Sequence, residues 1–371
     1  MGDWQVQGLR IGCANRDDLA ALEAKLERRG LGGAAMILPV SDTADDKVDV
    51  FLRPELAQRW LPGFDTTRLV WSLALDTGEI AALEMEILIA WLASPIRIEF
   101  PSVAELHAAM HVRRNIIAFG RRTSLSFDTA AAERPGDCWD YDEERGFTVR
   151  PGCNLIDALR RATQPERTGR LYSFSCYRAT EYVILLGIAE ALTECNSSLL
   201  ARLQQQCETR VIRSGQFHDV FLHEYGSQEM PFPPRYYVPG DRVWFRNPDE
   251  ASSDVTGFEG SWVIYLGGGQ FTNFWKIDSP YTLEDKCLEI YHWRHGVQRN
   301  AAGELKMDEH IVEQRVAESR LPGGDAALIL TKMMRLREPR GCWGMGGCID
   351  TTREWPRWIC PGTSDLHLPL Q

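Results

Sequence analysis

Cys176 is the residue in this sequence whose type and position most clearly favour chemistry. It stands near the start of the proline-free run 171–193, in which apolar residues recur at roughly helical spacing. A thiol in the first turn of a helix lies near unpaired backbone N–H groups and the positive end of the helix dipole, and both favour the nucleophilic thiolate. The run therefore predicts a mostly buried helix that presents a nucleophile. The alternative is that Cys176, one of ten cysteines, is an ordinary core residue.

The composition sets limits on the class of protein. The chain has 371 residues, 44% of them hydrophobic and 25% charged, which is typical of a soluble globular protein of one large or two smaller domains. A formal charge of −11 argues against binding to nucleic acid or to an acidic membrane, because both are polyanions. We see no signal peptide, and the apolar run 80–92 is too short to span a bilayer. We therefore expect a cytoplasmic protein with mostly reduced thiols.

Two smaller parts flank the region that contains Cys176. Residues 1–66 are predicted to form a small α/β unit, with a helix over 17–30 and strands over 33–40 and 48–52. Residues 340–371 contain Gly, Trp, Pro and three cysteines, and are expected to form an irregular tail.

The region between these parts mixes helical and strand patterns. The expected helices are 79–94, 102–123, 171–193, 198–207, 283–296 and 306–319, and the expected strands are 69–75, a hairpin around Trp139 and Phe147, 217–225, 243–245, 261–267 and 271–275. The last three strands should form an antiparallel meander. His107 and His111 lie four residues apart on one predicted helix, but no third ligand stands nearby, so we expect no metal.

Four segments carry a resemblance to a known family. FPSVAELHAAMHVRRNII, YSFSCYRATEYVILLGIA, PGDRVWFRNPD and GSWVIYLG occur in the same order in the bacillar spore-coat transglutaminases, which are protein-glutamine γ-glutamyltransferases with a papain-like core of the NlpC/P60 type. The resemblance covers about residues 68–335. It implies an α+β fold in which a central, cysteine-bearing helix packs on an antiparallel sheet. Residues 67–339 are thus expected to form a transglutaminase-like domain that uses no cofactor.

The resemblance assigns roles to single positions. It makes Cys176 the nucleophile, while Ser175 stands where the bacillar enzymes have an acid. The catalytic Glu of the family falls on Ser261, and its His falls near Asn273, so the usual base and third group are replaced.

Another residue must then move protons for the thiol. Glu259, two residues before the replaced Glu, is one candidate. His223, which matches a family His ahead of the Gly-Asp turn, is the one we favour, because an imidazole can accept the thiol proton and return it to a leaving amine. Substrate contacts are expected from residues beside these positions, namely Ser175, Trp262 and Phe274.

The implied reaction is an acyl transfer. Cys176 attacks a carboxamide of a glutamine- or amide-containing protein or peptide, ammonia leaves, and an amine or water resolves the thioester. The replaced positions leave two alternatives open. One is a degenerate transglutaminase fold kept as a binding or scaffold protein, and the other is a cysteine amidase or peptidase that acts on a small peptide-like substrate.

Overall fold

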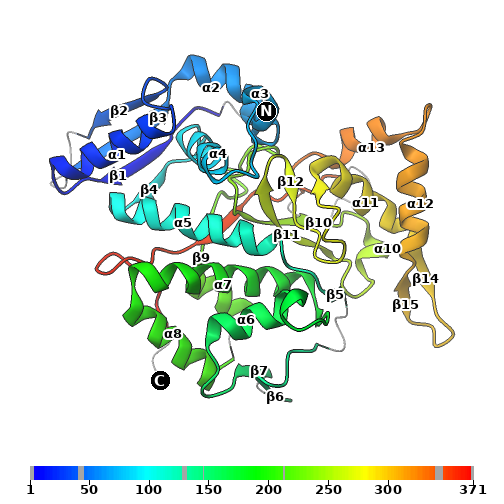
Figure 1. Cartoon of the computed structure of the whole chain (residues 1–371). Coiled ribbons are helices and arrows are strands. Elements are labelled where there is room, and N and C mark those ends of the chain that lie inside the picture. The colour runs from blue at the N-terminus through cyan, green and yellow to red at the C-terminus, as the bar shows by residue number, and fades with distance from the viewer. Residues whose placement is uncertain are drawn as a thin grey trace.

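The central helix of the fold carries Cys176. The computed structural model describes residues 4–40, 46–127, 132–144, 146–211, 214–338 and 346–368. Figure 1 shows helix α7 (Cys176–Cys195) in the middle, beneath α5 (Val103–Gly120), with the N-terminal elements above them. A mixed sheet-and-helix region lies to one side, and it ends in α12 (Glu309–Ser319) and α13 (Ala326–Met333). The expected α+β class is confirmed.

Helix α7 forms as its sequence predicts. Ser175 caps it, since its hydroxyl accepts a hydrogen bond from Arg178 N at 3.3 Å, and Cys176 is the first helical residue. Gly187 lets α5 cross closely, because a Cβ at this position would lie 2.5 Å from the Ile116 side chain. On its other side α7 packs on strand β11 (Gly260–Gly267), which places the cysteine over a sheet.

That sheet has six strands in the order β13-β12-β11-β10-β16-β9, and all its pairings are antiparallel. The predicted meander is confirmed at β10 and β11, while its last strand is only two residues long. The tail supplies β16 between β10 and β9, so the prediction of an irregular tail is wrong. The bounds are β9 Leu222–Tyr225, β10 Arg242–Arg246, β12 Gln270–Phe271, β13 Tyr281–Thr282 and β16 Arg353–Pro356.

A second sheet, in the order β2-β3-β1-β4, lies in the N-terminal region. The predicted helix and two strands are present as α1 (Arg16–Arg28), β2 (Ala35–Pro39) and β3 (Lys47–Leu52). Strand β1 (Leu9–Gly12) pairs in parallel with β4 (Ile98–Phe100), which comes from beyond residue 66. The expected domain boundaries at residues 66 and 339 stay a prediction.

Two segments predicted as strands are helical in whole or in part. The run 69–75 forms α3 (Leu69–Leu73), and the run 217–225 is divided between α9 (Ser214–Phe221) and β9. Both are short apolar runs, whose period does not separate a strand from a buried helix turn.

The remaining elements are α2 Pro54–Trp60, α4 Ile80–Leu92, β5 Ser126–Phe127, β6 Trp139–Asp142, β7 Gly146–Val149, α6 Leu155–Thr163, β8 Ser173–Phe174, α8 Ser197–Thr209, α10 Glu250–Ser253, α11 Leu283–Gly296, β14 Val297–Arg299 and β15 Leu305–Met307, with single 3-10 turns at Pro62–Phe64, Thr66–Arg68 and Pro165–Arg167.

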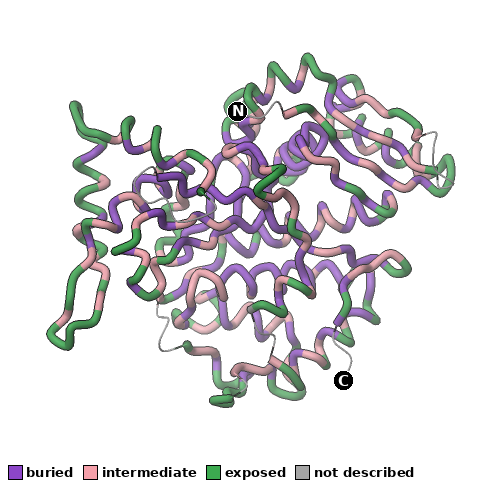
Figure 2. The backbone as a smooth tube through the Cα atoms, turned by 180° about the vertical axis from the view of Figure 1, so that it is seen from behind, coloured by how far each residue is buried: buried purple, intermediate pink, exposed green. Residues whose placement is uncertain are grey.

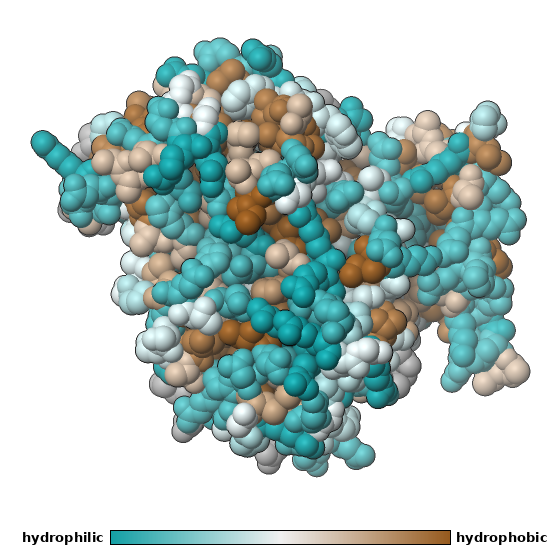
Figure 3. Space-filling view, in the orientation of Figure 1, coloured by the Kyte–Doolittle hydropathy of each residue, from teal (hydrophilic) through white to brown (hydrophobic). Residues whose placement is uncertain are grey.

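Burial follows this arrangement. Figure 2 shows buried residues concentrated along the central helices and the sheet, with exposed residues on the outer loops and helices. Figure 3 shows mostly polar side chains on one face, with apolar ones in small groups. Within the described ranges, no helix is both long enough and apolar enough to cross a membrane.

All nine described cysteines are free, including Cys138 and Cys153, whose thiols lie side by side in the predicted hairpin.

Glu86, on α4, is a buried carboxyl that holds the turn after β11. It accepts hydrogen bonds from the Tyr265 hydroxyl and from Gly268 N, each at 3.0 Å. The turn needs glycine, because Gly267 has a φ of +80° and a Cβ there would lie 2.7 Å from the Glu86 carboxylate. Burial raises the pKa of Glu86 to about 7, although these hydrogen bonds and the charge of Arg121 oppose the rise.

This pKa should make stability depend on pH. An ordinary glutamate titrates near 4.5, so between that pH and about 7 the folded chain holds a proton that the unfolded chain has released. The contribution of Glu86 is present at low pH and is lost as the pH rises through about 7, by about 3 kcal/mol. Urea denaturation at about pH 5 and about pH 8 should show this loss in wild type and not in Glu86→Gln. Equal pH dependence in both proteins would contradict it.

Candidate active site

Cys176 lies in a pocket of about 360 Å³ between the start of α7 and the first residues of β11. Aromatic rings form much of its wall. Trp244 and Trp262 are paired across β10 and β11 and are stacked, with ring centroids 6.0 Å apart. The Tyr177 ring is nearly perpendicular to the Trp262 ring, with centroids 5.3 Å apart. The described lining residues are Phe127, Ser175, Cys176, Tyr177, Trp244, Thr256, Gly257, Glu259, Gly260 and Trp262.

Some features of the site raise the pKa of the Cys176 thiol, and others lower it. Burial raises the pKa of Cys176 above its usual value. Hydrogen bonding from the backbone N–H groups of Trp262 and Tyr177 and the charges of Lys286 and Arg242 act to lower the pKa. The net shift is upward, although the N–H groups at the helix start favour the thiolate as expected. The reason is that desolvation of a thiolate outweighs the N–H groups of one helix turn.

Glu259 shares the pocket with Cys176, as one of our two candidate bases. Its Oε1 accepts a hydrogen bond from Gly257 N at 3.2 Å, and its own backbone oxygen accepts from Asn247 N at 3.0 Å, which fixes the loop ahead of β11. Among the described residues that line the pocket, it provides the only carboxylate. The predicted contacts Ser175 and Trp262 also line the pocket.

Three other predicted site residues lie outside this lining. Ser261 is buried in β11 opposite Phe245. Asn273 is buried in a turn, where its side chain donates to Ser279 O and accepts from Lys276 N. Phe274 is a core residue, so its predicted substrate contact is wrong. Ser261 and Asn273 are therefore held by the fold, and neither is presented to a substrate in this pocket.

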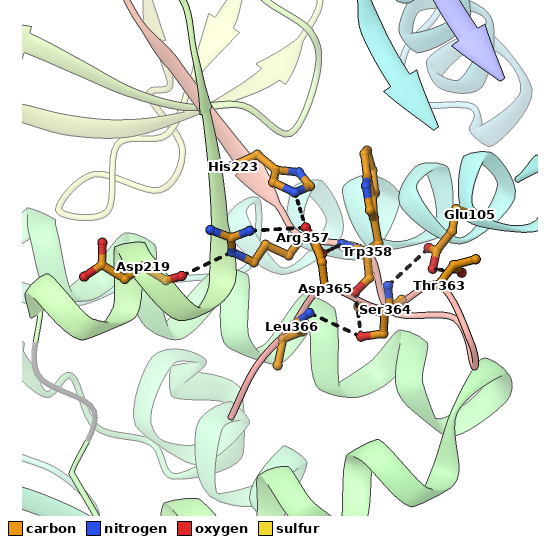
Figure 4. A network of polar contacts seen from close by, with 10 residues as sticks. Glu105, Asp219, His223, Arg357, Trp358, Thr363, Ser364, Asp365 and Leu366 are labelled. Atoms are coloured by element: carbon orange, nitrogen blue, oxygen red, sulfur yellow. Dashed lines mark hydrogen bonds and ion pairs between the residues drawn. The ribbon is translucent and has the colours of Figure 1, made fainter. Parts of the chain in front are cut away.

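His223 is not brought to Cys176, and our preference for it as the base is wrong. It lies on β9, at the edge of the sheet, with β16 and β10 between it and β11. Its Nε2 lies 2.6 Å from Asp365 Oδ2, and its ring packs on Trp358, as Figure 4 shows. Both partners belong to the tail, whose placement beside β9 had no signal in the local sequence.

Sequence reasoning missed two cations near the thiol. Arg242 lies in the segment PGDRVWFRNPD, where only its neighbours suggested a strand, and Lys286 lies on α11. Lys286 is buried and pairs with Glu289 at 2.6 Å, with its ammonium over the Tyr281 ring. The sequence did contain a signal for such buried cations, namely an Arg or Lys at a strand or helix position whose neighbours are buried. Within the described ranges, no group of three or more His, Cys, Asp or Glu side chains is arranged to hold a metal ion.

A cysteine-bearing helix packed on an antiparallel sheet, with an aromatic pocket at the helix start, defines the class of α+β protein that the sequence resembled. A sequence model of the protein-glutamine γ-glutamyltransferases matches residues 69–342. The chain therefore belongs to the transglutaminase family, whose members carry out cysteine-dependent acyl transfer.

Two similar proteins add detail. A protein-glutamine γ-glutamyltransferase of Halalkalibacterium halodurans is 26% identical over 208 residues, which are 53% of this chain and 65% of that relative. The chain thus spans less than two thirds of that relative's length. A solved transglutaminase from Geobacillus stearothermophilus, without its C-terminal extension, is 19% identical, with a TM-score of 0.41, over 58% of this chain and 98% of that one.

Proposed function

We propose that this protein transfers acyl groups from carboxamides through a thioester on Cys176. The Sγ thiolate attacks the carboxamide carbon of a glutamine-containing protein or peptide, and we assign the stabilisation of the oxyanion to the N–H groups of Tyr177 and Trp262, which act on the thiol. The C–N bond breaks and ammonia leaves with the proton taken from the thiol. An amine then forms an isopeptide bond, or water gives deamidation.

Glu259 is the residue we assign to proton transfer. The observation that carries the proposal is that one cavity holds a helix-start thiol and a carboxylate. A carboxylate in reach of the thiol can accept its proton and give it to the departing ammonia, and in the second half-reaction it can take a proton from the incoming amine or water. Because the thiol has to stay reduced, we also propose that the protein works in the cytoplasm.

A second candidate function is a binding or scaffold role. The observation that favours it is that Ser261 and Asn273, at the positions of the family's Glu and His, are buried in the fold. An aromatic pocket with one carboxylate could then hold an amine-bearing peptide without reacting with it. Amidase work on a small peptide-like substrate remains within the first proposal, since it uses the same thioester with water as the acceptor and differs only in the substrate.

Ammonia release from a glutamine-containing peptide, with and without a primary amine, tests the proposal. Cys176→Ala should release no ammonia above the uncatalysed rate, because the nucleophile is lost. Glu259→Gln should be slower by about 10²- to 10⁴-fold, the usual loss for a general acid–base. The control is Glu250→Gln, since Glu250 is exposed on α10 and does not line the pocket. Wild type that is no faster than Cys176→Ala, yet binds the peptide, would favour the scaffold role.

A further inference from the structure

Arg242 is a buried cation beside the pocket, and three different elements hold it. It is 1% exposed. Its guanidinium carbon lies 3.9 Å from the Trp262 ring centroid and 4.4 Å from the Tyr177 ring centroid. Its Nε donates to Thr180 Oγ1 at 2.8 Å, and its Nη1 donates to Glu354 Oε2 at 2.6 Å. Its charge therefore sits between two rings that line the Cys176 pocket.

Those two rings belong to the residues whose backbone N–H groups act to lower the pKa of the Cys176 thiol. Tyr177 follows Cys176 in the first turn of α7, and Trp262 lies on β11 opposite Trp244. A guanidinium whose carbon lies over both rings ties the helix start to the strand. A shift of Arg242 would thus move the N–H donors relative to the sulfur.

Glu354 is the counter-charge, and it comes from the tail. It lies on β16, directly opposite Arg242 in the ladder, so the two side chains share one face of the sheet. This strand lies beyond residue 342, where the match to the family ends. The other carboxylate oxygen of Glu354 lies 3.0 Å from His218 Nδ1, and a hydrogen bond from this histidine restrains it. The tail therefore reaches the site through one buried ion pair.

We propose that Arg242 and Glu354 are positioning residues for Cys176. Glu354, supplied by the tail strand, holds the guanidinium between Tyr177 and Trp262, and so fixes the two backbone N–H groups against the sulfur. Buried arginine needs such a partner, because an unpaired charge in the interior would draw the side chain towards water. The inference rests on Cys176 being the reactive thiol of the proposed function, and it does not depend on which amide or acceptor is used.

The test is the rate at which iodoacetamide alkylates Cys176, followed by peptide mapping across a range of pH. Arg242→Lys keeps the charge and loses the planar fork. If position matters, its Cys176 should react at least about tenfold more slowly at neutral pH, which corresponds to a thiol pKa one unit higher. Glu354→Gln should slow the reaction similarly, and the double variant should be no slower than either single one.

A matched control comes from the same tail. Asp365 also pairs a histidine with an arginine, His223 and Arg357, but at the edge of the sheet away from the pocket (Figure 4). Asp365→Asn should leave the alkylation rate of Cys176 unchanged. Denatured samples of all variants should react alike, which shows that any difference arises in the fold. Because the readout is alkylation, a protein that proves inactive on every amide still gives an answer.

Two outcomes would overturn the proposal. One is an unchanged Cys176 rate in Arg242→Lys. The other is faster alkylation in Glu354→Gln, which would mean that Arg242 acts by its charge alone and needs no positioning. If Glu354→Gln does not fold, Thr180→Val removes the hydrogen bond to Arg242 Nε without removing a charge. It should also slow alkylation, and a rate equal to that of wild type would count against the proposal.

Discussion

Asp241→Ala should lower the free energy of unfolding by about 3–5 kcal/mol, the usual loss when one partner of a buried ion pair is removed. Asp241 and Arg113 are almost fully buried, and Arg113 Nη1 donates to Asp241 Oδ1 at 2.9 Å. Burial raises the pKa of Asp241 and the charge of Arg113 opposes this rise. The aspartate also accepts from Val238 N at 2.8 Å. Alanine would leave both donors buried and one charge unbalanced.

The turn around this pair explains part of the motif PGD. Gly240 has a φ of +91°, and a Cβ on it would lie 2.9 Å from Arg113 Cγ, so glycine lets the guanidinium of α5 pass under the turn. That guanidinium also lies near the Trp91 and Trp355 rings. The pair thus joins α5, the turn before β10 and the tail strand. The Pro-Gly-Asp motif, which is part of the resemblance to the transglutaminases, therefore has mainly a structural role in this protein.

Urea denaturation measures this prediction. The control is Asp140→Ala, which breaks an ion pair with Arg150 whose side chains are about half exposed, 53% and 47%. That pair should contribute no more than about 1 kcal/mol. An Asp241→Ala loss as small as that of the control would show that the buried pair adds little to stability.

The second large effect is expected at Glu105. Its carboxylate is fully buried and accepts three hydrogen bonds from the tail, from Ile359 N at 3.1 Å, from Cys360 N at 2.7 Å and from Thr363 Oγ1 at 2.7 Å. Figure 4 shows part of this network beside His223. Glu105→Ala would leave these donors without an acceptor, and the loss of stability should be about 3–5 kcal/mol.

Limited proteolysis should reveal where the effect lies. In Glu105→Ala the segment 357–368 should be cut well before the rest of the chain, because its backbone hydrogen bonds to α5 are gone. Glu99→Ala is the control, since Glu99 is an exposed residue on the neighbouring β4. Cleavage at the same rate in both variants would mean that contacts other than Glu105 hold the tail.

Glu105 also shows what the sequence could and could not predict. Ser102 and Glu105 have the spacing of a capping box, and Ser102 does cap α5 by accepting from Glu105 N at 3.1 Å. The glutamate side chain, however, binds the tail. Local patterns are sufficient for such a cap, and they predicted the Cys176 helix and the meander, because each depends on neighbours in the chain. The partner of Glu105 is 254 residues or more away, and periodicity carries no information about it.

The active site was likewise predictable only where it depends on local patterns in the sequence. Cys176 and Glu259 meet because a helix start and the loop before a strand are adjacent in the expected topology. We predicted His223 to lie near Cys176, but β16 is inserted between β10 and the strand that carries His223. The four residues of β16 contain no local signal for this insertion. Tryptophan and proline in REWP suggested an irregular segment, whereas the pairing of that strand comes from both of its neighbours.

The insertion of β16 also sets the order in which the protein can be assembled. Arg242 and Glu354 are neighbours in the sheet but are 112 residues apart in the chain. On the ribosome, β9 and β10 emerge before β16, and the edges that β16 joins stay unpaired until residue 356 has been made. Unpaired edges of this kind invite pairing with other chains. The completed sheet, and with it the support for Cys176, arises only after β16 has been made, so chains that stop before this strand would carry the cysteine without its surroundings.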